Sequence, residues 1–267
     1  MPLHSSRPAK SARTYGKSDP IDALAVARAA LRHPDLPTAH LGGPSRELRL
    51  LVDHREDLVA ERTRVVNRLR WHLHELDPAW DPGALIRYVT LDAVDERLTG
   101  FDGLVARIAA ELVVDVRTLT ERERALTKEI TARVEVMAPH LLAIPGVAHL
   151  TAAKIVGEVA DVRRFTHKDA FARHNGTAPL PVWSGNRDRH RLSRTGNRQL
   201  NAALHRVAIT QTRCFEPAIL FTKRRLESGS SKAEARRALK RRLSDVVYRA
   251  LVEDAFSVGD ATVNPAA

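Results

Sequence analysis

Two long stretches of the chain have the hydrophobic spacing of amphipathic helices. From Ser45 to Leu76, and again from about Asp102 to Met137, apolar residues recur in alternating steps of three and four positions. This spacing places them on one side of an α-helix. Two such helices separated by a connector predict a long antiparallel helical hairpin, which could dimerise as a coiled coil. Polar residues interrupt the first seam and favour loose pairing over a regular zipper: Arg55, Arg62 and His72.

Helix and loop signals organise the rest of the chain. Pro20 suits the first turn of a helix that we expect to end near Arg32, and Pro and Gly residues mark a linker over His33–Pro44. A short helix is expected within residues 83–97. After Pro139 short helical patterns follow one another and strand signals are scarce. The sequence predicts a mainly α protein in four parts: residues 1–44, the hairpin 45–138, a compact helical domain 139–254, and a disordered tail 255–267.

Positive charge is concentrated in one segment of the chain. Between Trp183 and Arg249 there are 17 Lys and Arg against 5 Asp and Glu, although the whole chain has a net charge of only +11. Such a concentrated field favours a polyanionic partner, because neutralising phosphates and releasing their counterions dominates nucleic-acid affinity. A purely structural helical scaffold is disfavoured, since this self-repulsion would be unrelieved.

Composition also restricts the compartment. The single cysteine, Cys214, cannot form an intrachain disulfide, which indicates a reducing compartment and a cytoplasmic protein. No apolar run approaches the roughly 18–20 residues that a membrane-spanning helix needs. The first 18 residues are basic but lack an apolar core, which argues against a secretory signal. We therefore expect no membrane partner.

A tight turn at Ile144-Pro145-Gly146-Val147 lies between two short helical patterns. Such a turn can offer backbone N–H groups to a DNA phosphate without reading bases, as in a helix-hairpin-helix element. Gly146 and Lys154 are the candidate contacts. A plain packing corner between two helices explains the same pattern equally well, and Ala148 occupies the position of the second glycine usual in such hairpins.

Asp19 and Asp22 are three residues apart at an expected helix start, so their carboxylates would share one face and could hold Mg²⁺. The same pattern is also an ordinary helix N-terminus, with an N-cap and an acid in the first turn. A metal site would need a third acid from elsewhere in the molecule.

The block from Gly176 to Leu204 combines a Pro-rich loop, the pair Ser184-Gly185 and a row of basic residues. A serine hydroxyl beside several guanidinium groups has the parts required for phosphoryl transfer, since the hydroxyl attacks and the cations stabilise the charge at phosphorus. The alternative is a turn followed by a solvated basic surface, because no partnered general base is visible nearby. Candidate nucleic-acid contacts here and in the last helix are Arg187, Arg189, Arg191, Arg194, Asn197, Arg198, Arg237 and Arg241.

These motifs resemble, in this order, those of one family of transposases. Lys17–Ala23 looks like its closing acidic motif, Ile144–Val147 like the opening of its C-terminal domain, and Gly176–Gly185 like its Gly-Leu-x-Pro…Ser-Gly signature, with Thr177 in place of the usual Leu. The family is the IS-one-ten insertion-sequence transposases, which join a DEDD RuvC-like domain to a serine-bearing transposase domain and act as RNA-guided recombinases.

The resemblance implies a function. Residues 1–44 would be the end of a RuvC-like α/β domain with its linker, and residues 139–254 the serine transposase domain. Ser184 would be the nucleophile that forms a covalent link to a DNA end, with Asp19 and Asp22 among the Mg²⁺-binding carboxylates. A structured guide RNA and a homo-oligomer, dimer or tetramer, are the implied partners besides DNA.

The sequence departs from the family's pattern at its start. The earlier Asp and Glu of the DEDD set have no counterpart here, so a complete Mg²⁺ site is not expected within this chain. We expect an N-terminally truncated transposase, through a misplaced start codon or gene decay, that could be inactive as it stands. The alternative is a non-catalytic protein that binds nucleic acid and oligomerises.

Overall fold

The computed structural model describes residues 19–32, 42–184, 187–191 and 196–263, with only the backbone considered for residues 181–191 and 258–263. The chain divides into two compact units, Met1–His40 and Leu41–Ala267. The first unit contributes helix α1 (Asp19–Arg32), which begins and ends as predicted. None of the described helices is long and apolar enough to cross a membrane.

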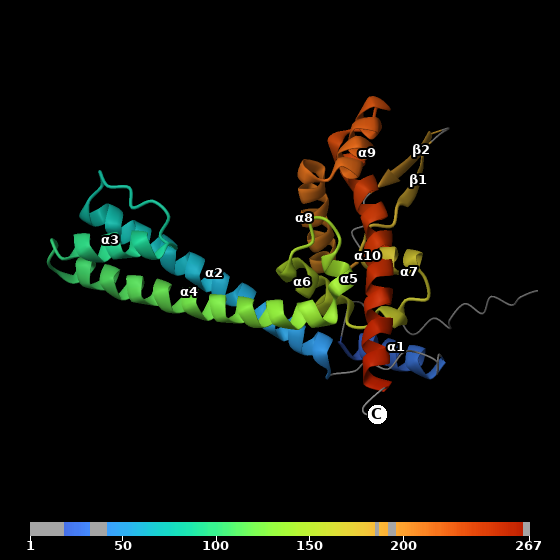
Figure 1. The fold of residues 1–267 in the computed structure, drawn as a ribbon, viewed down its shortest axis with the longest axis horizontal. Coiled ribbons are helices and arrows are strands. Elements are labelled where there is room, and N and C mark those ends of the chain that lie inside the picture. Colours follow the sequence, from blue (N-terminus) through green and yellow to red (C-terminus); the bar gives the residue numbers. More distant parts are fainter. Residues whose placement is uncertain (1–18, 33–41, 185–186, 192–195, 264–267) are drawn as a thin grey trace, which may run out of the picture. The chain divides into compact units, whose positions relative to one another are not determined.

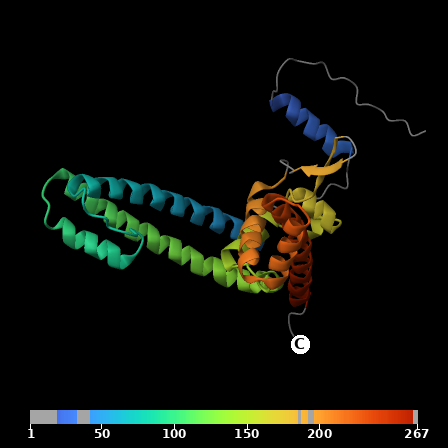
Figure 2. The same cartoon turned by 90° about the horizontal axis from the view of Figure 1, so that it is seen from above.

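The predicted hairpin is present in the second unit. Helix α2 (Pro44–Leu76) and helix α4 (Leu104–Met137) run side by side, and the short helix α3 (Tyr88–Leu98) packs against α4 near the far end of the hairpin (Figures 1 and 2). Proline at the first turn of α2 needs no N–H partner there, which explains why the helix begins at Pro44. Buried side chains from the three helices form one core: Leu58, Val65, Leu69, Leu91, Val94, Leu112 and Val116.

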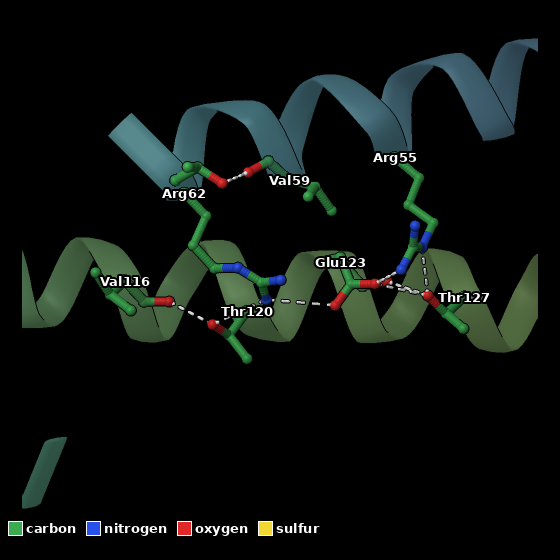
Figure 3. A network of polar contacts seen from close by, with 8 residues as sticks. Arg55, Val59, Arg62, Val116, Thr120, Glu123 and Thr127 are labelled. Atoms are coloured by element: carbon green, nitrogen blue, oxygen red, sulfur yellow. Dashed lines mark hydrogen bonds and ion pairs between the residues drawn. The ribbon is translucent and has the colours of Figure 1, made fainter. Parts of the chain in front are cut away.

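Two of the three polar residues in the α2 seam are paired across the hairpin, whereas His72 lies 3.5 Å from Glu75 of its own helix. Arg55 and Arg62 both form ion pairs with Glu123 of α4, whose side chain is 11% exposed (Figure 3). Arg55 Nε also donates to Thr127 Oγ1 at 2.7 Å, and Thr127 Oγ1 donates to Glu123. A satisfied buried polar cluster stabilises only the register in which its partners meet. The α2–α4 pairing is therefore specified at this level, contrary to the loose pairing expected from the sequence.

Short helices and one β-hairpin follow α4 and form the second core of this unit. Phe171, Ile155 and Leu204 are among its fully buried side chains, and Leu48 and Ile130 from the base of the α2–α4 hairpin join them. The elements are α5 (Pro139–Leu142), α6 (His149–Val159), the 3₁₀ turn η1 (Val162–Arg164), α7 (Lys168–His174), β1 (Leu180–Ser184), β2 (Arg187–Arg191), α8 (Arg198–Cys214), α9 (Glu216–Glu227) and α10 (Lys232–Val263).

The mainly α fold is confirmed, and three details differ from expectation. The helical hairpin and the C-terminal helices share a core, so they form one compact unit rather than separating at residue 138. An antiparallel β-hairpin, β1–β2, occupies part of what was expected to be a loop. Helix α10 continues to Val263 and does not give way to a disordered tail after Asp254.

Asp254 joins α10 to the start of α5. Its side chain is buried and accepts hydrogen bonds from the backbone N–H groups of His140, at 2.8 Å, and Leu141, at 3.2 Å. The His140 ring nitrogen Nδ1 lies 2.9 Å from the same carboxylate. The carboxylate thus satisfies the unpaired N–H groups at the start of α5 and ties α10 to it.

Candidate nucleic-acid interface

The β1–β2 hairpin carries the predicted nucleophile. Ser184 is the last residue of β1 and is the register partner of Arg187, the first residue of β2; Arg189 and Arg191 occupy alternate positions after it. Gly185 lies outside the described residues, as does Arg194. The strand was hard to predict because Pro181 cannot donate to the sheet and the arginine-rich β2 lacks the β-branched residues typical of strands.

The two ends of the segment that contains this hairpin meet at a close contact. A Cβ atom at Gly196 would lie 2.9 Å from both Gly176 N and His174 O, and Gly196 has a φ of +136°. The Asn197 N–H donates to His174 O at 2.7 Å. Only glycine permits this approach, so the segment leaves the helical core and returns to it at a fixed point.

His174, at the C-terminal end of α7, adds no positive charge at the point where the β1–β2 segment leaves the core. Its Nε2 lies 3.0 Å from Arg164 Nη2, and burial together with the charge of Arg164 lowers the pKa of His174. A neutral imidazole can accept the guanidinium hydrogen bond.

Asn197 has a structural role at the same place. It caps α8 by accepting the Leu200 N–H at 2.8 Å, and its amide donates to Glu158 Oε2 of α6 at 2.5 Å. The Glu158 carboxylate is buried, and Arg49 of α2 reaches its other oxygen at 3.7 Å. Three elements are thereby joined at the start of α8.

The turn expected to contact phosphate packs onto α8. Gly146 adopts a φ of +83°, and a Cβ atom there would lie 3.3 Å from the Thr210 side chain. Gln211 Nε2 donates to the Pro145 carbonyl at 2.8 Å. The α5–turn–α6 element therefore has the connectivity of a helix-hairpin-helix, but these contacts are those of a packing corner.

Lys154 is buried and paired with two carboxylates of α2. It is 3% exposed, and its ammonium donates to Asp53 at 3.1 Å and to Glu56 at 2.8 Å. Burial opposes its charge, but the two carboxylates outweigh that effect and raise the pKa of Lys154. This lysine joins α6 to α2 and is not part of the proposed nucleic-acid interface.

The other arginines predicted to contact nucleic acid differ in how strongly carboxylates already pair with them. Arg198 is exposed beside the base of the β1–β2 segment. Arg237 lies 3.9 Å from Glu234, a weak surface pair, whereas Arg241 pairs with both Asp169 and Asp245. Arg198 and Arg237 are thus available to a phosphate, and Arg241 mainly joins α10 to α7.

A polar cluster that was not predicted from the sequence lies between α8 and α10. Lys240 Nζ donates to Asn201 Oδ1 at 2.6 Å, and Asn201 Nδ2 donates to the Asn175 carbonyl at 2.7 Å. Asn175 is fully buried and donates to Ser244 Oγ at 2.8 Å. One sequence signal for this cluster was a spacing of four residues, which places two side chains on the same face of a helix. It occurs between Asn201 and His205 and between Arg236 and Lys240.

Asp19 and Asp22 both lie in the first turn of α1. Among the described residues there is no group of three or more His, Cys, Asp or Glu side chains that could hold a metal ion. Mg²⁺ prefers six oxygen ligands in near-octahedral geometry. The two aspartates supply part of such a set and do not by themselves make a site.

The described residues form a mainly α protein with one β-hairpin, and comparison with known proteins gives its family. The model described as "Transposase IS116/IS110/IS902 family" matches residues 138–224, and the IS110-type DEDD transposase model matches residues 1–78. The chain belongs to the IS110/IS116/IS902 family of transposases.

Similar proteins come from three bacteria. The chain is 28% identical to the 44.8 kDa uncharacterized protein of insertion element IS116 from Streptomyces clavuligerus, over 88% of this chain and 71% of the relative. It is 26% identical to the 43.6 kDa uncharacterized protein of IS110 from Streptomyces coelicolor, over 90% and 72%. It is also 26% identical to the transposase of IS1111A from Coxiella burnetii, over 70% and 53%.

Proposed function

We propose that this protein acts in insertion-sequence transposition, with DNA as its substrate and Ser184 as the nucleophile. The observation that carries the proposal is the placement of Ser184 at the end of β1, opposite Arg187 and followed by arginines at alternate positions of β2. Alternate positions of a strand lie on one face. Arg187, Arg189 and Arg191 thus suit successive contacts to a phosphate backbone, while the contacts at Gly196 and Asn197 fix the segment to the core.

The proposed step is a phosphoryl transfer. The Ser184 hydroxyl oxygen attacks the phosphorus of a DNA phosphodiester, a P–O bond to one deoxyribose breaks, and the released strand end takes a proton as a hydroxyl. The product is a phosphoserine diester, which a hydroxyl from a second strand attacks in reverse to reseal the DNA. Arginine guanidinium groups stabilise the extra negative charge on the phosphoryl oxygens during both steps.

Two further features follow from family resemblance. We place Asp19 and Asp22 in the Mg²⁺ site of the DEDD domain, with the remaining ligands supplied from outside the described residues. We also propose that a structured RNA selects the DNA sites by base pairing and that the protein works as a homo-oligomer.

The experiment that tests the catalytic proposal is DNA strand exchange by the protein with and without Ser184→Ala. Loss of exchange with retained DNA binding supports Ser184 as nucleophile, and wild-type exchange by the variant rejects it. If the wild-type protein binds nucleic acid with a steep salt dependence but exchanges no strands, the non-catalytic binding function is the better account.

A further inference from the structure

Two of the described lysines are almost completely buried. One has carboxylate partners, and the other has a neutral hydrogen-bond partner. Lys154 is 3% exposed and its charge is matched by the carboxylates of Asp53 and Glu56. Lys240 is 7% exposed, and its ammonium donates to the neutral side-chain oxygen of Asn201. A buried ammonium is costly unless an anion and sufficient hydrogen bonds compensate it. Lys154 meets that requirement and Lys240 does not.

The groups around Lys240 increase the imbalance. Arg236 lies one turn earlier on α10, and in the part of the chain that the structure describes neither residue forms an ion pair with a carboxylate. Burial and the charge of Arg236 lower the pKa of Lys240. Burial, Lys240 and Arg236 together lower the pKa of His205, one turn after Asn201 on α8. Three basic side chains therefore lie close enough to affect one another's ionisation, and no carboxylate pairs with them in the described part of the chain.

We infer that this α8–α10 cluster, formed by Asn201, His205, Arg236 and Lys240, binds a phosphate group of a nucleic-acid backbone. A phosphodiester supplies the missing negative charge and can accept from both the Lys240 ammonium and the Arg236 guanidinium, and Asn201 orients the lysine. The cationic cluster also fits a transposase, whose substrate is a polyanion; in that respect the inference rests on the proposed function. Neither lysine nor arginine here is needed for the attack by Ser184.

The cluster is coupled to the base of the β1–β2 segment. Asn201 holds Lys240 through its side-chain oxygen and holds the Asn175 carbonyl through its side-chain nitrogen. Asn175 directly precedes Gly176, the residue against which Gly196 closes the segment. A phosphate bound at the cluster is thus connected, through Asn201 and Asn175, to the point where the β1–β2 segment closes, and this would set the register of the nucleic-acid strand relative to Ser184.

The test is Lys240→Met in the full chain, measured by thermal unfolding and by salt-dependent binding of a short DNA duplex and, separately, an RNA stem-loop. Methionine keeps the length of the side chain and removes the uncompensated charge. We expect an unchanged or higher Tm without nucleic acid, and a shallower slope of log Kd against log salt. The slope should change by about 0.9 for the DNA duplex, or by about 0.7 for the RNA stem-loop if the bound phosphate lies in its single-stranded loop. The probe that shows the loss identifies which nucleic acid occupies the cluster.

Two further variants complete the design. Arg236→Gln, at a half-buried position, should give the same loss of slope without a loss of Tm, and covers the case in which Lys240→Met does not fold. Lys128→Met, at an exposed position of α4, should leave Tm and slope unchanged. Lys154→Met should lower Tm, since it leaves Asp53 and Glu56 without their buried partner.

The inference is overturned if neither probe changes its slope in Lys240→Met and Arg236→Gln, whatever the Tm. A Tm that falls as in Lys154→Met would in that case make Lys240 a structural residue only. Ser184→Ala is expected to bind both probes with the wild-type slope. Failure of the nucleophile assignment therefore leaves this result intact, and failure of the phosphate site leaves the nucleophile assignment intact.

Discussion

The side-chain amide of Asn197 donates a hydrogen bond to the buried carboxylate of Glu158 at 2.5 Å, while its side-chain oxygen caps α8. Asn197 follows Gly196 directly, so this contact fixes the point at which the β1–β2 segment returns to the core. An asparagine in a basic, glycine-containing block could be taken for a nucleic-acid contact from sequence alone. Its partners show that it supports the segment that carries Ser184, and its predicted contact with nucleic acid stays a prediction.

Replacing Asn197 should separate its two bonds. Asn197→Ala removes the cap and leaves Glu158 short of a partner, and we expect it to lower the free energy of unfolding by about 1–3 kcal/mol. Asn197→Ser retains an N-cap oxygen and should recover roughly 1 kcal/mol of that loss. Urea unfolding of the three proteins measures both effects. Equal stability of the alanine variant and the wild type would show that neither bond stabilises the fold.

The contact at Gly196 gives a second prediction. Gly196→Ala would place a Cβ atom 2.9 Å from the backbone at Gly176 and His174, at a φ of +136°. We expect the free energy of unfolding to fall by roughly 2–3 kcal/mol, because of backbone strain and the clash. The matched control is Gly229→Ala, where φ is +86° but no atom lies within 4 Å, so that only about 1 kcal/mol of conformational strain applies. Equal losses at the two sites would contradict the close approach.

The polar cluster of the helical hairpin predicts an acid-sensitive contribution to stability. Burial opposes ionisation of Glu123, but the hydrogen bond from Thr127 and the charges of Arg55 and Arg62 outweigh it and lower its pKa below 4.5. A lowered carboxyl pKa stabilises the folded protein at pH values above the unfolded pKa, and this stabilisation is lost as the pH falls through the folded pKa. Glu123→Gln should therefore cost roughly 1–3 kcal/mol at neutral pH and less in acid.

Unfolding of the Glu123→Gln variant at a series of pH values checks this prediction. Glu129→Gln is the control, because Glu129 forms an exposed i,i+4 pair with Arg133 that should contribute less than about 0.5 kcal/mol. A pH profile of Glu123→Gln parallel to that of the wild type would mean that the cluster does not depend on the carboxylate charge.

The sequence predicted the helices well where a hydrophobic repeat extends over many residues. The hairpin helices were located to within two residues, since Leu58, Leu69, Leu112 and Val116 needed a common partner and had only one another. The connection between Arg55 and Glu123 did not follow, because a polar residue in a seam does not reveal its partner 68 positions away. Helix α9 was missed although Glu216-Pro217 is a regular helix start, since its 12 residues bury only Ala218 and so lack a clear apolar stripe.

Only part of the candidate site could be predicted from the sequence, because the rest depends on contacts between distant segments. The motif order around Ser184 indicated the family, which the comparisons confirm. Spacing could not distinguish Lys154, whose charge is matched by two carboxylates of α2, from Lys240, whose charge is not. That difference depends on which helices pack together. It is therefore a property of the tertiary structure and not of either local sequence.

The central claim, that Ser184 attacks DNA, is tested most directly by trapping its covalent product. A duplex with a bridging phosphorothiolate releases a thiolate that needs no proton, so a covalent intermediate accumulates even when acid catalysis is incomplete. Digestion and mass spectrometry should place the nucleotide adduct on Ser184 and find none in Ser184→Ala, while Ser193→Ala, a hydroxyl control from the same basic block of the sequence, retains it. An adduct on another residue, or an undiminished adduct in Ser184→Ala, would contradict the account.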